Sequence, residues 1–296
     1  MHARSVLRGV AALAVGLALA VPAAAQEATL LGALNMRGQQ ALLGGLSALE
    51  MADDGAAMVA VSDRGIVFQA DIARDGAGRI VAVTLTGSEE LLGQDGRRGP
   101  WAARDSEGVA RGADGTLFLS FEGDHRVARY LGGAVTETLP PHPDFAGFAS
   151  NAALEALAID AEGRLYAVPE DPGAGARAFP VYRFADGAWD RRLSIPRAGR
   201  FLAVGADFDD RGRFYLLERD FSLLFGFAAR IRRFSLTDAG LSEETTLLTT
   251  RYGQFSNLEG LSLWRNADAR IVASMVSDDN FSSFLPTQIV EFLLPE

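Results

Sequence analysis

Carboxylate side chains recur at two places in a pattern that the chain repeats along its length. Glu107, Glu155 and Glu259 each stand at the start of a short apolar run. A second group follows the next apolar run, where the chain carries Asp63, Glu122, Asp124, Glu170, Asp171, Glu218, Asp220, Asp278 and Asp279. The start of the first strand of a hairpin lies beside the end of the second. Both groups are therefore expected on one face, around a central opening.

Such a ring of carboxylates would bind hard cations, chiefly Ca²⁺, through oxygen ligands. The chain has no EF-hand or other contiguous calcium loop, so the ligands would come from separate repeats. The same ring could instead bind a basic ligand or polarise water, and acids after a strand also cap backbone amides in turns. Arg64 and Arg219 lie among the acids and could pair with some of them. The candidate metal ligands are Asp63, Glu107, Glu155, Asp171, Glu259 and Asp278.

The candidate catalytic residues are Glu155 and Glu259, which share one repeat position, together with Arg64, which could hold a phosphate oxygen. His125 follows the acids of the second repeat and is the candidate base, whereas His142 is expected in a loop. No Gly-x-Ser-x-Gly elbow and no Gly-x-Gly-x-x-Gly after a strand occurs. The scarcity of histidine and the lack of a nucleophile motif also suit a binding protein without catalysis.

Composition narrows the chemistry further. The 296 residues include no cysteine, and all 28 basic residues are arginine, which excludes thiolate metal sites and Schiff-base chemistry. Residues 1–25 have the pattern of a secretory signal, with Arg4 and Arg8 before an apolar run and Ala23 to Ala25 before the expected cleavage. The mature protein is then expected in the periplasm or outside the cell.

Charge sets the expected partners. The formal net charge is −10, and loss of the signal, which holds two arginines and no acid, makes it −12. A chain this acidic repels nucleic acid and anionic lipid and favours cations or basic partners. We expect a monomer without a stable membrane anchor, acting on a small-molecule phosphate or ester substrate or binding a cationic ligand.

The repeats themselves indicate the elements that position these acids. Five segments, beginning near residues 44, 105, 152, 202 and 256, share a strand–turn–strand pattern. The first four turns carry Gly55, Gly115, Gly163 and Gly212, whereas the fifth has residues 266–268 and is expected to be longer. Third strands are expected at 66–72, 127–131, 180–184, 229–236 and 288–294, and fourth strands at 80–85, 134–139, 189–195 and 244–249.

Four-stranded units at this spacing are typical of propeller blades. The last unit lacks a fourth strand, which residues 28–34 could supply, closing the ring. We therefore expect an all-β protein whose residues 26–296 form one propeller of five visible blades. A sixth blade could lie within 87–101 or 219–230, and a two-domain β-sandwich protein is the rival architecture.

One apolar stretch, residues 220–234, stands beside the expected acidic face. Its residues Phe221, Phe225 and Phe227 are expected in a loop between strands. They could pack inside a blade, or they could form an apolar lip beside the opening that contacts substrate.

Several of these segments resemble the bacterial phytase-like, esterase-like proteins. The resemblance rests on GGLSAL with VAVSDRG, LEALAID with EGRLYAVPED, NLEGLSL, and SDDNFSSFLPTQIVEFLL, and it runs from Gly44 to the C-terminus. It implies a secreted β-propeller linked to phosphoester or ester hydrolysis. The related β-propeller phytases use Ca²⁺ between carboxylates and phosphate, with basic side chains on the phosphates; here the cations are all arginine, and those calcium ligands are not matched residue by residue.

Overall fold

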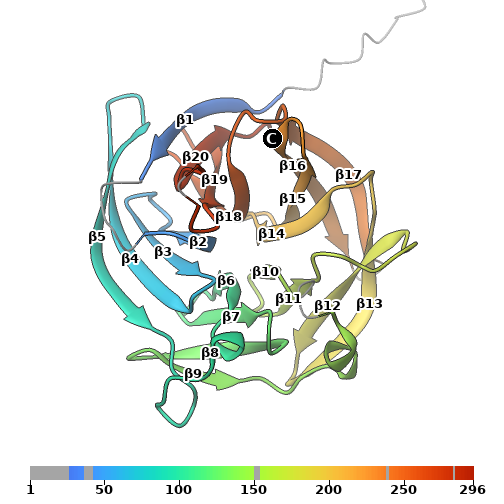
Figure 1. Cartoon of the computed structure of the whole chain (residues 1–296). Coiled ribbons are helices and arrows are strands. Elements are labelled where there is room, and N and C mark those ends of the chain that lie inside the picture. Colours follow the sequence, from blue (N-terminus) through green and yellow to red (C-terminus); the bar gives the residue numbers. More distant parts are fainter. Residues whose placement is uncertain (1–26, 37–42, 150–153, 238–239, 283) are drawn as a thin grey trace, which may run out of the picture.

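The computed structural model describes residues 27–36, 43–149, 154–237, 240–282 and 284–296. They form five four-stranded antiparallel sheets arranged as blades around an axis (Figure 1). The expected signal segment, residues 1–25, lies outside the described residues. No helix among the described residues is long and apolar enough to cross a membrane.

In four blades the strands follow chain order from the axis of the ring outward. In the last blade the outermost strand comes from the N-terminus instead. Blade I contains β2 (Leu46–Met51), β3 (Ala57–Ser62), β4 (Ile66–Arg74) and β5 (Ile80–Glu90). Blade II contains β6 (Ser106–Arg111), β7 (Leu117–Phe121), β8 (Arg126–Gly132) and β9 (Val135–Thr138). Blade III contains β10 (Ala156–Ile159), β11 (Leu165–Val168), β12 (Ala178–Ala185) and β13 (Ala188–Pro196). Blade IV contains β14 (Leu202–Phe208), β15 (Arg213–Ser222), β16 (Gly226–Thr237) and β17 (Gly240–Thr249). Blade V contains β18 (Asn257–Arg265), β19 (Ile271–Asp278), β20 (Gln288–Leu293) and, as its outer strand, β1 (Thr29–Asn35).

The N-terminal strand closes the ring, as the sequence predicts. β1 pairs antiparallel with β20, from Thr29 opposite Leu293 to Asn35 opposite Gln288. The two ends of the described chain thus share one sheet (Figure 1). Pairing the outer edge of β20 removes an exposed strand edge, which is the physical advantage of closing the ring this way.

The blade count is five, and neither proposed hiding place holds a sixth. Residues 87–90 are the end of β5. A connection that contains the short 3₁₀ helix η1 (Trp101–Ala103) follows. Residues 219–230 form the end of the β15–β16 hairpin. The β-sandwich alternative is excluded by the same sheet topology.

The hairpin turns explain the repeated glycines. Gly55, Gly115, Gly163 and Gly212 all have φ between 68° and 85°, the left-handed region that favours glycine. The prediction that the fifth repeat has a longer turn is wrong. Asn266 and Arg270 bracket it with the same hydrogen-bond pattern as Asp160 and Arg164, and Ala269 takes the glycine place at φ 59°.

Irregular starts of the inner strands bring the blades close together at the axis. The register of the first two strands shifts at Ser47, Glu107 and Val204, and again at Glu259–Gly260, in blades I, II, IV and V. A bulge re-aims a side chain and bends the strand. A Cβ on Gly260 would lie 2.6 Å from Ala48 Cα in the neighbouring blade. The small residue after each bulge therefore permits the close contact between inner strands.

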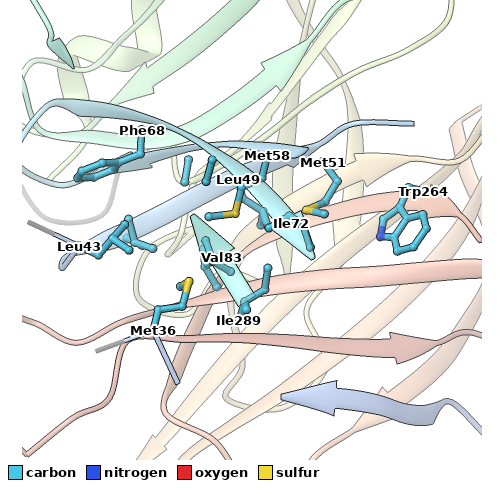
Figure 2. Close-up of a cluster of buried hydrophobic side chains, with 14 of the residues drawn as sticks. Met36, Leu43, Leu49, Met51, Met58, Phe68, Ile72, Val83, Trp264 and Ile289 are labelled. Atoms are coloured by element: carbon cyan, nitrogen blue, oxygen red, sulfur yellow. The ribbon is translucent and has the colours of Figure 1, made fainter. Parts of the chain in front are cut away.

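The hydrophobic core lies mainly between neighbouring blades. The cluster between blades I and V combines Leu49, Phe68 and Ile72 with Val276 and Ile289, all buried (Figure 2). Equivalent clusters lie between the other blades. Since each blade buries its faces against two others, the ring fixes where the inner strands begin.

Candidate functional site

One end of the ring gathers the acidic side chains. Each inner strand starts at this end and each second strand ends there, because neighbouring strands are antiparallel. We call this group the carboxylate cluster, and it comprises Asp63, Asp105, Glu107, Glu122, Glu155, Glu170, Glu259 and Asp278. Members of both predicted groups thus meet at this end, whereas five acids of the second group make other contacts, namely Asp124, Asp171, Glu218, Asp220 and Asp279.

Three members of the carboxylate cluster, all in blade II, form a candidate cation site. One oxygen each from Asp105, Glu107 and Glu122 lies within 4.8 Å of the others. Asp105 is 2% exposed, and its Oδ1 has no hydrogen-bond partner. An unpaired buried carboxylate oxygen is costly. The triad is therefore chemically suited to a cation with oxygen ligands.

Arg219 neutralises the other side of the cluster. Its Nη2 donates to Glu170 Oε1 and its Nη1 donates to Glu259 Oε1, each at 2.5 Å. Asn257 hydrogen-bonds to both members of the Arg219–Glu259 pair. Its Oδ1 accepts from Arg219 at 2.8 Å, and its Nδ2 donates to Glu259 at 2.8 Å. The guanidinium therefore bridges blades III and V from its place on β15. Among the described residues, no ion pair joins Arg219 or any other arginine to Asp105 or Glu107.

Crowding and burial raise the pKa values of these acids. Burial, followed by repulsion from Glu155 and Glu259, holds the pKa of Glu107 well above its usual range. Burial raises the pKa of Glu259 to about 8, although Arg219 opposes the shift. Burial likewise raises the pKa of Asp105 to about 6. Burial disfavours the charged form of Arg219, but Glu259 and its neighbours outweigh this and raise its pKa above the ordinary value. These carboxyls therefore bind protons more readily than exposed carboxyls do.

The junction of blades V and I completes the cluster. Burial and the charges of Asp278 and Asp105 raise the pKa of Asp63 to about 7. Asp279 instead has a structural role: it accepts from Gly45 N and Phe281 N at 3.0 Å and from Thr287 Oγ1 at 2.9 Å. It ties the β19–β20 connection to the entry of β2.

Five of the six candidate metal ligands come together here, namely Asp63, Glu107, Glu155, Glu259 and Asp278. The pKa values of these acids respond to one another's charges, as for Glu155 with Glu259 and for Asp63 with Asp278. The structure places Asp171 elsewhere: it accepts from Gly173 N and pairs with Arg197 at 3.4 Å. Its neighbour Glu170 reaches the cluster instead.

The two other candidate catalytic residues lie at the margin or outside the cluster. Arg64 is exposed, and its guanidinium stacks 3.1 Å from the centre of the Phe281 ring. His125 lines a separate hollow of about 510 Å³ with His142, where it packs edge-on against Phe148. His142 caps η2 (Pro143–Gly147), accepting from Asp144 N, so it does lie in a connection as expected.

Sequence reasoning missed Asp105 and named Glu122 only as an acid beside the repeat position. Asp105 precedes its strand by one residue, and Glu107 follows it at the bulge. The repeated Glu-Gly or Glu-Ala pair identifies Glu107 and its equivalents, but no repeated feature of the sequence marks Asp105.

A family comparison agrees with this arrangement. The profile of the family described as "Phytase-like: Esterase-like activity of phytase" matches residues 41–281. The chain belongs to this family. The match covers the inner strands of all five blades and every member of the carboxylate cluster. It confirms the resemblance seen in the sequence. No curated protein matches this phytase-like chain.

Solved structures give looser likenesses. A gluconolactonase from Xanthomonas campestris is 15% identical over 93% of this chain and 97% of its own, with a TM-score of 0.47. The PQQ-bound aldose sugar dehydrogenase from Streptomyces coelicolor is 13% identical over 89% and 98%, with a TM-score of 0.49. Virginiamycin B lyase from Staphylococcus aureus is 13% identical over 91% and 75%, with a TM-score of 0.42. Likenesses at this level transfer no activity to the phytase-like chain.

Proposed function

We propose that this propeller hydrolyses phosphoesters or carboxylic esters at the carboxylate cluster with the help of a divalent cation, Ca²⁺ being the best match to the ligands. The observation that carries the proposal is the buried, unpartnered Oδ1 of Asp105 within a triad of converging carboxylates. Membership of the phytase-like family supports hydrolysis as the reaction class.

Asp105, Glu107 and Glu122 would hold the cation, and Asp63 lies close enough to influence Asp105 electrostatically. A bound cation would offset negative charge on the substrate and lower the pKa of a water molecule. The division of the cluster fits this role, because Arg219 already neutralises Glu170 and Glu259. In the part of the chain that the structure describes, no arginine forms an ion pair with Asp105 or Glu107.

Glu259 and Glu155 would handle protons. Glu259 pairs with Arg219, yet burial raises its pKa to about 8, so its carboxyl would exchange a proton near neutral pH, as donation to a departing oxygen requires. The pKa of Glu155 is also raised, first by burial and then by Glu170. Arg219 and Asn257 hold the Glu259 carboxyl in one orientation. Arg64, exposed at the margin, would contact a substrate phosphate.

Hydrolysis of p-nitrophenyl phosphate and p-nitrophenyl acetate, with Ca²⁺ or with a chelator, tests the proposal. Glu155→Gln and Glu259→Gln should each lower the rate by roughly 10²-fold, because charge stabilisation and proton transfer are lost while shape is kept. Asp171→Asn is the matched control, since this acid lies outside the cluster, and should keep full activity. Turnover that survives both glutamine substitutions would place the chemistry elsewhere, with His125 the next residue to test.

The second candidate is a propeller that binds a basic ligand without catalysis. The clamp of Glu170 and Glu259 on Arg219 favours it, because it shows that paired carboxylates here accommodate a guanidinium. No turnover of either substrate by the wild type would favour this function. In both proposals the pattern of residues 1–25 supports export of the protein to the periplasm or beyond.

A further inference from the structure

A convex apolar tip stands at the carboxylate end of the ring. The β15–β16 hairpin is paired as far as Ser222 and Gly226, and its turn consists of Leu223, Leu224 and Phe225. These side chains are 93%, 85% and 65% exposed. Tight turns ordinarily carry Gly, Asn, Asp or Ser, which favour turn geometry and face water. Three large apolar residues at such a place therefore point to a contact outside the molecule.

Other exposed apolar residues share this face. Phe284 is 92% exposed in the β19–β20 connection, and Trp101 is exposed in the connection from β5 to β6. Turns from second to third strands and connections from fourth to first strands all lie at the carboxylate end, because strands alternate in direction. The exposed apolar residues thus lie at three places on the end that carries the carboxylate cluster.

The base of the tip is aromatic and basic. Tyr252 is exposed and donates its hydroxyl to Asp220 Oδ2 at 2.6 Å. Arg200, largely exposed, donates to Phe221 O at 2.9 Å and pairs with Asp220 at 3.2 Å. The loop that carries the exposed Arg251 is fixed to the hairpin by a hydrogen bond from Gly253 N to Phe227 O at 2.8 Å.

From tip to base the order is apolar, then aromatic, then charged, where Arg200 and Arg251 are exposed and Asp220 pairs with Arg200. The same order of environments runs from the acyl chains of a bilayer through its interface to its phosphates. We propose that residues 223–225 insert into a lipid bilayer, with Tyr252 at the interface and Arg200 and Arg251 near lipid phosphates. This is reversible docking rather than an anchor, and it would turn the carboxylate cluster toward the membrane.

The net charge sets the lipid preference. At a formal charge of −10 the whole chain is not attracted to an anionic surface over long range. Binding should therefore come from apolar insertion and be strong enough to detect on phosphatidylcholine. Added phosphatidylglycerol or a change in ionic strength should alter it little.

Vesicle sedimentation with the full chain tests the docking. Wild-type protein should bind phosphatidylcholine vesicles, and the triple variant L223S/L224S/F225S should bind at least about 100-fold more weakly, because three large apolar side chains no longer enter the bilayer. V81S/L131S is the matched control, since it removes two exposed apolar residues on β5 and β8, and should bind like the wild type. Every protein carries the same N-terminal residues, so the difference reports the tip.

A second measurement places the tip in the membrane. Tryptophan emission in Phe225→Trp should shift to the blue on vesicles and be quenched by brominated acyl chains. Equal binding by the wild type and the triple variant would overturn the proposal. Failure of the wild type to bind vesicles would also overturn it. A wild type that forms a dimer in sedimentation velocity, lost in the triple variant, without binding vesicles would overturn it in favour of self-association.

Discussion

At the scale of single residues, one internal cation, Arg219, stabilises part of the carboxylate cluster, while buried oxygens of Asp63 and Asp105 have no hydrogen-bond partner. Arg219 accounts for Glu170 and Glu259, whereas Asp105 keeps a buried oxygen without a donor. Burial of like charges is unfavourable, so the fold tolerates the cluster by protonation, by Arg219 and, we propose, by a bound cation.

Removing the internal cation should be costly. Arg219→Met leaves Glu170 and Glu259 buried without their partner, and at pH 8 the free energy of unfolding should fall by about 3 kcal/mol or more. The loss should be smaller at pH 5, because Glu259, whose pKa burial raises to about 8, takes up a proton there. Arg265→Gln is the control, since its surface ion pairs with Asp210 and Glu296 should each contribute less than about 1 kcal/mol. Urea denaturation at both pH values measures this, and an equal loss at both would argue against the cluster's electrostatics.

Stability should also depend on pH without divalent cations. A group whose folded-state pKa is raised stabilises the fold below its unfolded pKa and loses that contribution as pH rises through the folded value. Asp105, Asp63 and Glu259 have pKa values of about 6, 7 and 8, against 3.8 to 4.5 unfolded. Asp207, near the opposite end of an inner strand, adds to this with a pKa of about 7.

The free energy of unfolding should therefore decline between about pH 5 and pH 8. Asp63→Asn removes one of the titrating groups, which Asp278, Asp105 and Asp279 repel and Arg64 attracts, so the variant should decline less steeply. Denaturant midpoints across this range provide the measurement. Identical slopes for the variant and the wild type would contradict the assignment to Asp63.

At the scale of elements, the site depends on how closely inner strands approach. Gly260→Ala would force its Cβ to within 2.6 Å of Ala48 Cα, against backbone that cannot move aside cheaply. We expect a loss of about 2 kcal/mol in the free energy of unfolding. Gly76→Ala, where a Cβ meets nothing within 4 Å, should change it by less than about 0.5 kcal/mol. Equal melting temperatures for the two variants would refute the close packing.

The sequence supplied the strands, the ring closure and the gathering of acids, because these depend on alternation and on turn glycines. It did not supply the exact membership of the cluster. Counting from a turn glycine assumes second strands of equal length, whereas β11 of blade III has four residues and β3 of blade I has six. Since side chains alternate along an extended chain, a one-residue difference decides whether Glu170 or Asp171 faces the axis. The pairing of Arg219 was anticipated, but its two partners depend on three blades that only the fold brings together.

At the scale of the whole molecule, ring closure by β1 holds the blades at fixed angles, so acids that are far apart in sequence keep fixed separations. Asp105 and Glu107 belong to blade II, and Glu259 belongs to blade V. The charge of Glu259 nevertheless raises the pKa of Glu107. The apolar tip of blade IV stands at the same end of the ring. Hydrolysis and membrane docking, both proposals, would thus share one face.

Calorimetric titration of the full chain with Ca²⁺ is the most direct test of the cation site. The wild type should bind one Ca²⁺ per carboxylate triad, and Glu107→Gln should weaken binding at least about 10-fold, because a charged ligand is lost. Asp171→Asn, which lies outside the carboxylate cluster, should bind like the wild type. No binding heat with the wild type, or equal affinity in Glu107→Gln, would contradict the assignment of Asp105, Glu107 and Glu122 as a cation site.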